Sequence, residues 1–188
     1  MPDADWWTAL WPDPEGVLRR LGITEAMTVI DLCCGDGYFT APMIRIVGDA
    51  GHVYAVDLDP KMLAQARAAV GADGACTWIQ ADACAMADTI PGKADFILIA
   101  NTFHGIPDQP SFCESVAQAL KPGGHFAIIN WHAAPREETP VLGKPRGPAS
   151  ALRMSPADTE AVVAPAGFGL EKTIELAPYH YGAVFART

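Results

Sequence analysis

Residues 29–40 read VIDLCCGDGYFT, an apolar segment that reaches an acid and then runs directly into a turn with two glycines. A hydrophobic run such as 27–32 suits a strand that is buried on both faces of a parallel sheet. Gly35 and Gly37 allow the backbone that follows to turn tightly and to approach a ligand. The stretch therefore predicts the first strand and first turn of a doubly wound α/β fold.

A second apolar strand with an acidic end follows at 53–59, VYAVDLD. Asp57 ends this strand twenty residues after Gly37. At that position a carboxylate can accept hydrogen bonds from both hydroxyls of a ribose. Together the two strands predict a pocket for a cofactor that carries adenosine. A glycine-rich first turn also occurs in doubly wound sheets that bind no ligand, so the glycines alone leave both interpretations open.

The pattern beyond Asp57 continues an alternation of helices and strands. We expect a helix at 60–70, a strand at 77–81 that ends in Asp82, a strand at 96–100 that ends in Asn101, a helix at 109–120, a turn at 121–124 and a strand at 125–131. Near the end of the chain we expect a helix with Ser155 as its N-cap and Gly167 at its end, and then an antiparallel hairpin at 170–176 and 179–186.

In this order the pieces resemble the class I S-adenosylmethionine-dependent methyltransferases, specifically the compact small-molecule branch that includes the quinone-biosynthesis methyltransferases. The resemblance covers roughly 28–131, and the C-terminal helix and hairpin more loosely. It implies a Rossmann-like, doubly wound, mostly parallel seven-stranded sheet with a C-terminal antiparallel hairpin, in one domain over residues 1–188. One position departs from the family's first motif. Cys33 stands where the first of three glycines would be, which leaves slightly less room for the cofactor.

The resemblance implies S-adenosylmethionine as the cofactor and places residues around it. The methionine moiety is assigned to Asp31, to the backbone of Cys33, Gly35 and Gly37, and to Asn101 near the ammonium group. The adenosine moiety is assigned to Asp57 for the ribose hydroxyls, Leu58 and Met62 for an adenine face, Asp82 for the adenine amino group, and the Ala83 backbone beside it. Carboxylates accept from such donors, and apolar side chains can enclose a purine. Capping roles for the strand-end acids are the alternative.

The chemistry that the resemblance implies is in-line displacement at a sulfonium methyl group, which needs positioning and exclusion of water rather than an obligatory catalytic residue. The best candidate for proton transfer is His104, in the loop after the strand at 96–100, because histidine can accept a proton near neutral pH. A structural hydrogen bond that shapes the loop is the alternative role. His132 and His180 are weaker candidates, since histidines flanked by aromatic residues are often simply packed.

Residues 1–21 fall outside the regular alternation and contain Trp6, Trp7 and Trp11. Three tryptophans must cover apolar surface. They either pack on the core or form part of a lid over cofactor and substrate.

Residues 133–154 form a second irregular segment, which is rich in proline and contains four basic residues: Arg136, Lys144, Arg146 and Arg153. Because the segment follows the carboxyl end of a strand, where open α/β sheets bind ligands, we expect a substrate-facing loop. Its charge suggests a small methyl acceptor with a carboxylate or phosphate. Solvated charges paired with Glu137 and Glu138 are the alternative.

Composition limits the classes of partner. The chain has 188 residues, 50% of them apolar, and a net charge of −9 without a run of lysine or arginine, which disfavours nucleic acid. No apolar run could span a bilayer and no leader pattern begins the sequence, so we expect a cytoplasmic protein. Five cysteines without paired Cys/His spacing indicate thiols and no metal site. The oligomeric state stays open.

Two other classes of function compete with a methyltransferase. A nicotinamide dehydrogenase would carry Gly-x-Gly-x-x-Gly/Ala, whereas this chain reads GDGYFT at 35–40, and its bulky residues crowd the place of a pyrophosphate. A non-catalytic S-adenosylmethionine-binding or interaction protein on the same fold is the second, because fold alone does not determine function. The favoured prediction is methyl transfer from S-adenosylmethionine to a small-molecule acceptor.

Overall fold

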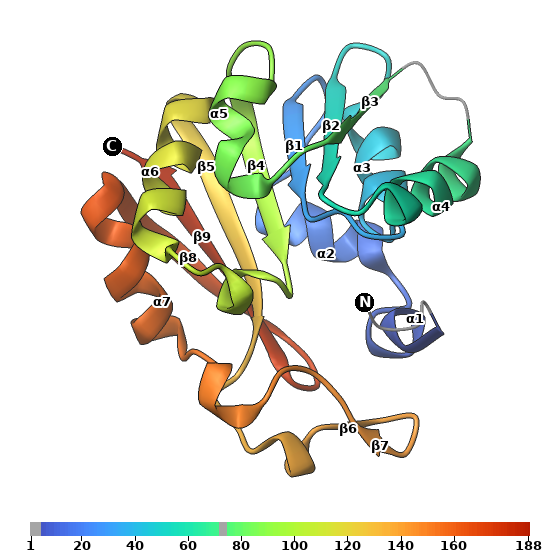
Figure 1. Cartoon of the computed structure of the whole chain (residues 1–188), viewed down its shortest axis with the longest axis vertical. Helices are drawn as coiled ribbons and strands as arrows, with labels where there is room; N and C mark the ends of the chain where they lie inside the picture. Colours follow the sequence, from blue (N-terminus) through green and yellow to red (C-terminus); the bar gives the residue numbers. More distant parts are fainter. Residues whose placement is uncertain (1–4, 72–74) are drawn as a thin grey trace.

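The computed structural model describes residues 5–71 and 75–188, which form a seven-stranded sheet between layers of helices (Figure 1). The strand order is β3-β2-β1-β4-β5-β9-β8. The strands are β1 Thr28–Leu32, β2 His52–Asp57, β3 Cys76–Gln80, β4 Ala94–Ala100, β5 Leu120–Trp131, β8 Phe168–Leu176 and β9 His180–Arg187. β1 to β5 pair in parallel, and β9 pairs antiparallel with β5 and β8. The predicted Rossmann-like sheet with a C-terminal hairpin is confirmed.

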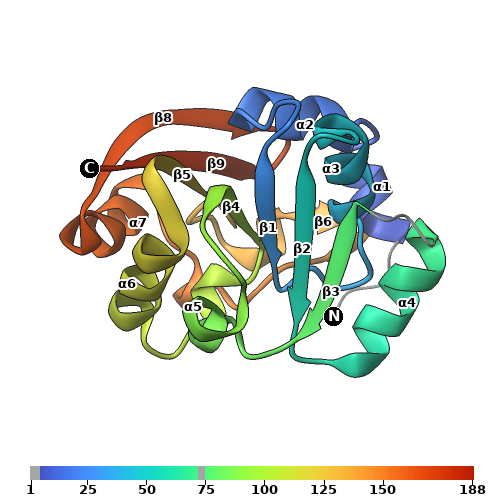
Figure 2. The same ribbon diagram turned by 90° about the horizontal axis from the view of Figure 1, so that it is seen from above.

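Helices cover both faces of this sheet (Figure 2). One face carries α2 (Pro14–Leu21), α3 (Thr40–Val47) and α4 (Pro60–Val70), and the other carries α5 (Met86–Thr89), α6 (Gln109–Ala119) and α7 (Pro156–Val163). Alternate residues of each central strand enter different cores, as Leu98 and Ile99 of β4 do. None of the helices in residues 5–71 and 75–188 has the length and hydropathy of a transmembrane span.

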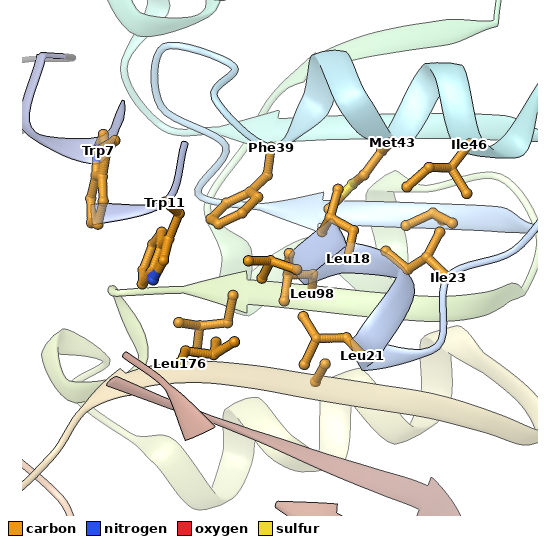
Figure 3. Packing of buried hydrophobic residues seen from close by; sticks show 14 of the residues in the cluster. Trp7, Trp11, Leu18, Leu21, Ile23, Phe39, Met43, Ile46, Leu98 and Leu176 are labelled. Atoms are coloured by element: carbon orange, nitrogen blue, oxygen red, sulfur yellow. The ribbon is translucent and has the colours of Figure 1, made fainter. Parts of the chain in front are cut away.

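The first core joins the N-terminal helices to the sheet (Figure 3). Trp11 follows α1 (Asp5–Leu10), and its ring lies 5.7 Å from that of Phe39. Leu18 and Leu21 of α2 are almost completely buried in the same cluster. Burying such a side chain stabilises the fold by about 1.5–3 kcal/mol. Residues 5–21, expected to be irregular, are therefore two helices that belong to the core, and residues 1–4 lie outside the described part.

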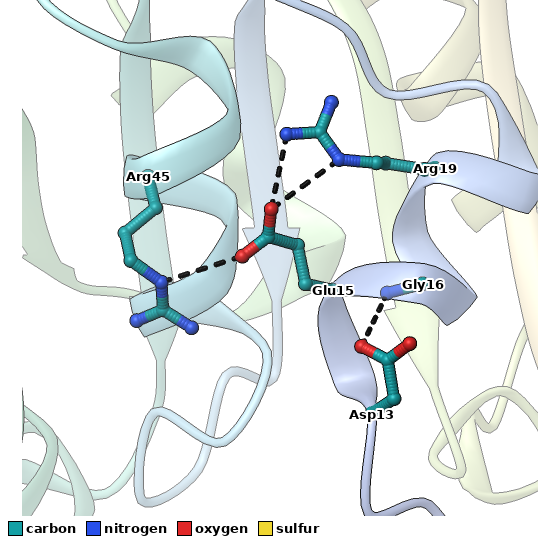
Figure 4. Close-up of polar contacts among 5 residues, drawn as sticks. All are labelled: Asp13, Glu15, Gly16, Arg19 and Arg45. Atoms are coloured by element: carbon teal, nitrogen blue, oxygen red, sulfur yellow. Dashed lines mark hydrogen bonds and ion pairs between the residues drawn. The ribbon is translucent and has the colours of Figure 1, made fainter.

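Polar contacts cap the N-terminus of α2 and link this helix to α3 (Figure 4). Asp13 caps the helix by accepting a hydrogen bond from the Gly16 amide at 2.8 Å. The Glu15 carboxylate forms two ion pairs: its Oε1 lies 3.0 Å from Nη2 of Arg19 in the same helix, and its Oε2 lies 3.5 Å from Nε of Arg45 in α3. Largely exposed ion pairs of this kind contribute at most about 1 kcal/mol each. Packing of the apolar side chains is thus the larger source of stability for this helix.

The later helices begin and end close to the predicted positions because their caps are local. Asp59 caps α4 by accepting from the Lys61 amide at 2.8 Å, and α4 has the predicted bounds 60–70. The Ser155 hydroxyl accepts from the Asp158 amide at 3.1 Å, so the predicted N-cap of α7 is confirmed. After α7 a short 3₁₀ turn leads to Gly167, which has a left-handed backbone.

The predicted turn at 121–124 lies within β5 instead of before it. β5 pairs with β4 on both sides of these residues, at Leu120 and at His125, with a shift of register between them. Gly123, with φ of +72°, allows the chain to bend at this point. The glycine-rich stretch is therefore a bulge in a continuing strand pair.

The segment 133–154 is also more ordered in its secondary structure than predicted. It contains a two-stranded ladder of β6 (Pro140–Val141) and β7 (Lys144–Pro145), flanked by 3₁₀ turns at Arg136–Glu138 and Ser150–Leu152. Contacts between β6 and α1 bring this segment to the N-terminal helix. Both segments that interrupt the regular alternation therefore meet at one end of the sheet.

Candidate active site

A cavity of about 370 Å³ lies at the carboxyl ends of β1 and β4. These neighbouring strands lead to connections that run toward opposite edges of the sheet, since β2 and β3 lie on one side and β5 on the other. Ligands of open α/β sheets bind at such a switch of direction. The walls come from the segments after β1 and after β4, from the tryptophans of α1, and from the loop after β5.

Asp31 forms the acidic side of this cavity. It is 2% exposed, and its Oδ2 accepts a hydrogen bond from the Thr40 hydroxyl at 2.6 Å. Burial is the main cause that raises the pKa of Asp31 to about 7; the hydrogen bond from Thr40 lowers it, and the negative charges of Asp57 and Asp36 add to the rise. None of the ion pairs among the described residues includes Asp31. A buried acid in acidic surroundings is suited to a ligand with positive charge.

The turn after β1 has three alternate residues in left-handed conformation: Cys33 (φ +57°), Gly35 (φ +58°) and Gly37 (φ +86°). Cys33 therefore adopts a backbone that favours glycine, at a cost of about 1–2 kcal/mol. Burial raises the pKa of Cys33 to about 12, and it also raises the pKa of Cys34. Both thiols are thus protonated at neutral pH and are poor nucleophiles.

The two further strand-end acids lie beside this turn. Asp57 accepts from the Gly35 amide and from the Asp59 amide, both at 2.9 Å, so it links the end of β2 to the glycine turn. Asp82 accepts from the Cys84 amide at 2.9 Å and so has the capping role considered as its alternative. The charges of both acids, like that of Asp31, raise the pKa of Cys33, which places the three carboxylates around one turn.

The residues expected to contact adenine follow the carboxyl ends of β2 and β3, with Met62 in the first turn of α4, and do not line the cavity itself. Leu58 is 65% exposed, Met62 is half-buried and Ala83 is buried. A leucine this exposed beside Asp57 offers an apolar surface next to a hydrogen-bond acceptor. That combination matches the needs of a nucleoside, although it extends beyond the cavity.

Asn101 follows β4 and faces the cavity from the other side. Its backbone is left-handed, with φ of +57°, which asparagine tolerates better than most residues. Both polar atoms of its side chain are buried without a hydrogen-bond partner among the described residues. A buried, unsatisfied amide costs about 1–3 kcal/mol, so this position favours a ligand that can both donate and accept.

His104 lies in the 3₁₀ turn Phe103–Gly105 and lines the same cavity. Burial and the positive charge of Arg153 lower its pKa, while the neighbouring Asn130 amide acts in the opposite direction. The imidazole is therefore neutral at physiological pH and able to accept a proton. The two other histidines considered lie elsewhere: His132 pairs with Glu175 at 2.9 Å, outside the cavity, and His180 is buried between tryptophan rings.

The N-terminal tryptophans combine the two roles that were considered. Trp6 and Trp7 line the cavity, with their rings stacked at 4.1 Å, and Trp11 lies in the core behind them. The Tyr38 hydroxyl donates to the Trp11 carbonyl and so ties this segment to the glycine turn. Packing on the core is thus evident, and movement as a lid stays a prediction.

The basic residues of 133–154 take three different positions. Arg136 and Arg146 line the cavity, and Lys144 is exposed on β7 away from it. Arg153 is 7% exposed and donates to main-chain carbonyls of its own loop. Among the described residues no ion pair links these groups to the glutamates at 137–138. Half of the predicted set therefore faces the site.

Three contributions to this site were not predicted from the sequence. Thr40 holds the Asp31 carboxylate, Trp131 at the end of β5 forms a wall, and Arg153 orders the loop. Thr40 could have been noticed as the first polar residue after the glycine turn. Nothing in the sequence marks Trp131 as a wall of the site. Arg153 was expected to face the substrate, and its role in ordering the loop was missed because its partners are an aromatic ring and backbone carbonyls.

The sequence of the chain is similar to those of known methyltransferases. Residues 29–124 match the family described as "Methyltransferase domain". The chain is 32% identical over 114 residues to the ubiquinone/menaquinone biosynthesis C-methyltransferase UbiE of Enterobacter sp. (strain 638). The aligned region covers 58% of this chain and 45% of that protein. The chain is 28% identical over 114 residues to the demethylmenaquinone methyltransferase of Lactococcus lactis subsp. lactis (strain IL1403), which covers 60% and 45%. The chain thus spans about half the length of these curated relatives.

The similarity to solved structures extends over nearly the whole chain. A SAM dependent methyltransferase from Aquifex aeolicus superposes with a TM-score of 0.84 at 27% identity, over 99% of this chain and 94% of that one. A putative type 11 methyltransferase from Sulfolobus solfataricus shares the fold, with a TM-score of 0.67 at 24% identity, over 86% and 83% of the two chains. The likeness therefore includes the regions on both sides of residues 29–124.

Proposed function

The chain belongs to the methyltransferase domain family, and on that premise we propose that it is an enzyme that transfers a methyl group from S-adenosylmethionine to a small-molecule acceptor. Membership of this family bears out the resemblance to the class I methyltransferases. The observation that carries the proposal is the placement of Asp31, Asp57 and Asp82 around one glycine turn, opposite the unsatisfied amide of Asn101.

We assign the cofactor to this edge of the sheet by the chemistry of each group. Asp31 and Asn101 would face the charged methionine end, where the amide supplies an acceptor for the ammonium group. Asp57 would accept from the ribose hydroxyls, because its oxygens retain lone pairs beyond the two amides that they already bind. Leu58, Met62, Asp82 and Ala83 would surround the adenine ring. The backbone of Cys33, Gly35 and Gly37 would lie against the methionine chain.

When bound, S-adenosylmethionine supplies an electrophilic methyl group on a sulfonium. The residues of this chain then have to hold the acceptor in line and keep water away. Trp6 and Trp7 are placed to exclude water, since both are buried and line the cavity. Neutral His104 is placed to accept the proton that an acceptor hydroxyl or thiol loses. We further propose that residues 5–21 can move as a cover, and that the whole chain acts as one cytoplasmic domain.

The test is calorimetric titration of the protein with S-adenosylmethionine, S-adenosylhomocysteine and NAD in parallel. We expect the two sulfur nucleosides to bind in the micromolar range and NAD not to bind. Binding of NAD alone would favour a dehydrogenase. Binding of the nucleosides with no turnover across an acceptor screen would favour the non-catalytic binder.

A matched pair of variants locates the site in the same titration. Asp57→Asn keeps the shape of the side chain but removes its charge, and we expect the affinity for S-adenosylhomocysteine to fall at least about tenfold. Asp49→Asn removes a charge from an exposed position outside the site and should leave the affinity unchanged. Equal affinity of the two variants would contradict the assignment of Asp57.

A further inference from the structure

We propose that the methyl acceptor is a small anion, a molecule that joins a carboxylate or phosphate to a flat apolar body, and that Arg136 and Arg146 bind its anionic group. This inference rests on the proposed function, because it names the acceptor of that same cavity.

The cavity is divided by charge. Its β1 side carries Asp31 and Asp36, whereas its loop side carries Arg136 and Arg146. A sulfonium cofactor is positively charged and suits the acidic side. A second cation would be repelled on the basic side, whereas an anion would be attracted to it. The electrostatics therefore favour an acceptor whose charge is opposite to that of the cofactor.

The two arginines retain free hydrogen-bonding capacity. Arg136 uses Nε to donate to the Gly147 carbonyl at 3.1 Å. Arg146 lies over the Trp6 ring at 5.9 Å from its centroid, and its Nε is buried with no hydrogen-bond partner in the described structure. Neither forms an ion pair with a described carboxylate. A buried charged donor without a partner is costly, and an oxyanion would satisfy it with good geometry.

Arg153 holds the loop that carries this pair and is not itself available to a ligand. Its guanidinium donates to the carbonyls of Arg146 at 2.9 Å, Ala134 at 3.0 Å and Pro148 at 3.3 Å. The backbone of Arg146 is therefore fixed before any acceptor binds. Such preorganisation lowers the entropic cost of binding the anion.

The apolar part of the acceptor follows from the aromatic wall beside the arginines. The Trp6 and Trp131 rings lie 5.9 Å apart at 38°, and both line the cavity. Rings of this kind favour a flat partner through stacking and edge contacts. Because a volume of about 370 Å³ has to hold both the reacting end of the cofactor and the acceptor, the acceptor is small.

The test measures binding of three related probes to protein saturated with S-adenosylhomocysteine: 4-hydroxybenzoate, phenyl phosphate and the neutral 4-hydroxybenzamide. We expect at least one anion to bind about tenfold more tightly than the amide. The relative affinity of the two anions identifies which oxyanion the site prefers. The advantage should shrink as salt concentration rises.

Variants within the loop provide the controls. Arg146→Gln and Arg136→Gln should each remove most of the preference for the anion. Lys144→Gln, on the same loop but outside the cavity, should keep it. Thermal melting of each variant checks that the fold is retained.

The failures of the two proposals are distinguishable in the same series. If S-adenosylhomocysteine binds but the amide binds as tightly as the anions, or neither anion binds, the anionic acceptor is wrong and the proposed function stands. A preference for anions that survives in Arg146→Gln and Arg136→Gln would contradict the assignment of these residues. Absence of S-adenosylhomocysteine binding would overturn the proposed function, and this inference with it.

Discussion

The guanidinium carbon of Arg153 lies 4.9 Å from the centre of the Trp131 ring. The arginine side chain is buried between β5 and the loop that follows this strand. This arginine has no carboxylate partner among the described residues. Its charge is instead met by three carbonyls and by the Thr139 hydroxyl at 2.9 Å. The contact therefore joins the loop to the sheet through one buried cation.

Replacing Arg153 with methionine should keep the apolar contact with Trp131 but remove every donor to the loop. We expect the free energy of unfolding to fall by about 2–4 kcal/mol, because several buried acceptors lose their partner. Arg153→Lys should recover only part of this loss, since an ammonium cannot reproduce the planar fork. Urea unfolding measures both, with exposed Lys144→Met as a control that should change stability by less than about 0.5 kcal/mol. A stable Arg153→Met protein would show that the loop does not depend on these bonds.

Gly147 allows the loop to lie flat on Trp131. A Cβ atom at this position would stand 2.6 Å from Cε2 of that ring. Gly143, in the same loop, also has a positive φ but has no atom within 4 Å of such a Cβ. Both Gly147→Ala and Gly143→Ala should lose about 1 kcal/mol from the backbone, and Gly147→Ala about 1–3 kcal/mol more from overpacking. Thermal unfolding of the two variants measures the cost of the contact with Trp131 as the difference between their losses of stability. Equal losses would mean that the loop can shift away from the ring.

Asp31 should make the stability of the free protein depend on pH. Its pKa in the folded protein is about 7, above its unfolded value of 3.8, so the folded state binds the proton more strongly. Below about pH 4 this difference in pKa adds up to about 4 kcal/mol to the free energy of unfolding. That stabilisation is lost as the pH rises to about 7. Asp31→Asn should flatten this part of the profile. Denaturant titrations from pH 4 to 8 test it, and identical slopes for the two proteins would contradict a raised pKa.

His104 should titrate below its ordinary value of 6.5, because burial and Arg153 lower its pKa. The neutral form therefore dominates at pH 7, and kcat at saturating substrates should rise through that pKa and then level off. His104→Gln should lower kcat by about 10²–10⁴ and remove this rise, while the affinity for S-adenosylhomocysteine is retained. His132→Gln, which alters a histidine outside the cavity, is the matched control. An NMR titration of the His104 ring gives the pKa directly, and a value above 6.5 would exclude the expected shift.

The elements that could be predicted from the sequence carry their signals within a few residues. α4 begins where Asp59 precedes Pro60, and the strand ends are marked by acids after apolar runs. α3 was not predicted, because Phe39 at its N-cap makes no side-chain hydrogen bond and so gives no start signal. α2 does carry a capping aspartate and a glycine directly after its end, but the prediction for residues 1–21 rested on the tryptophans, for which packing on the core and a lid were both open.

The candidate site was predictable to a similar degree and for the same reason. Asp31 is predicted from its place near the end of a strand, and Asn101 and His104 from their places after one; the structure brings all three to one cavity. Arg146 lines the cavity, whereas Arg153 binds the loop backbone. Their spacing in the sequence could not predict this difference, since the partners of Arg153 are carbonyls up to 19 residues away. Long-range contacts of the backbone leave no mark in side-chain pattern.

The position of β9 between β5 and β8 has a consequence during translation. β9 is the last of the seven strands along the chain, yet it is an interior strand of the sheet. Fifty-six residues separate the end of β5 at Trp131 from the end of β9 at Arg187. At about 5–20 residues per second, the nascent chain leaves the backbone N–H and C=O groups at this edge of β5 without their partner strand for about 3–11 seconds. A ribosome-bound chain of this protein is therefore most exposed to strand-to-strand aggregation, and most in need of a chaperone, during that interval.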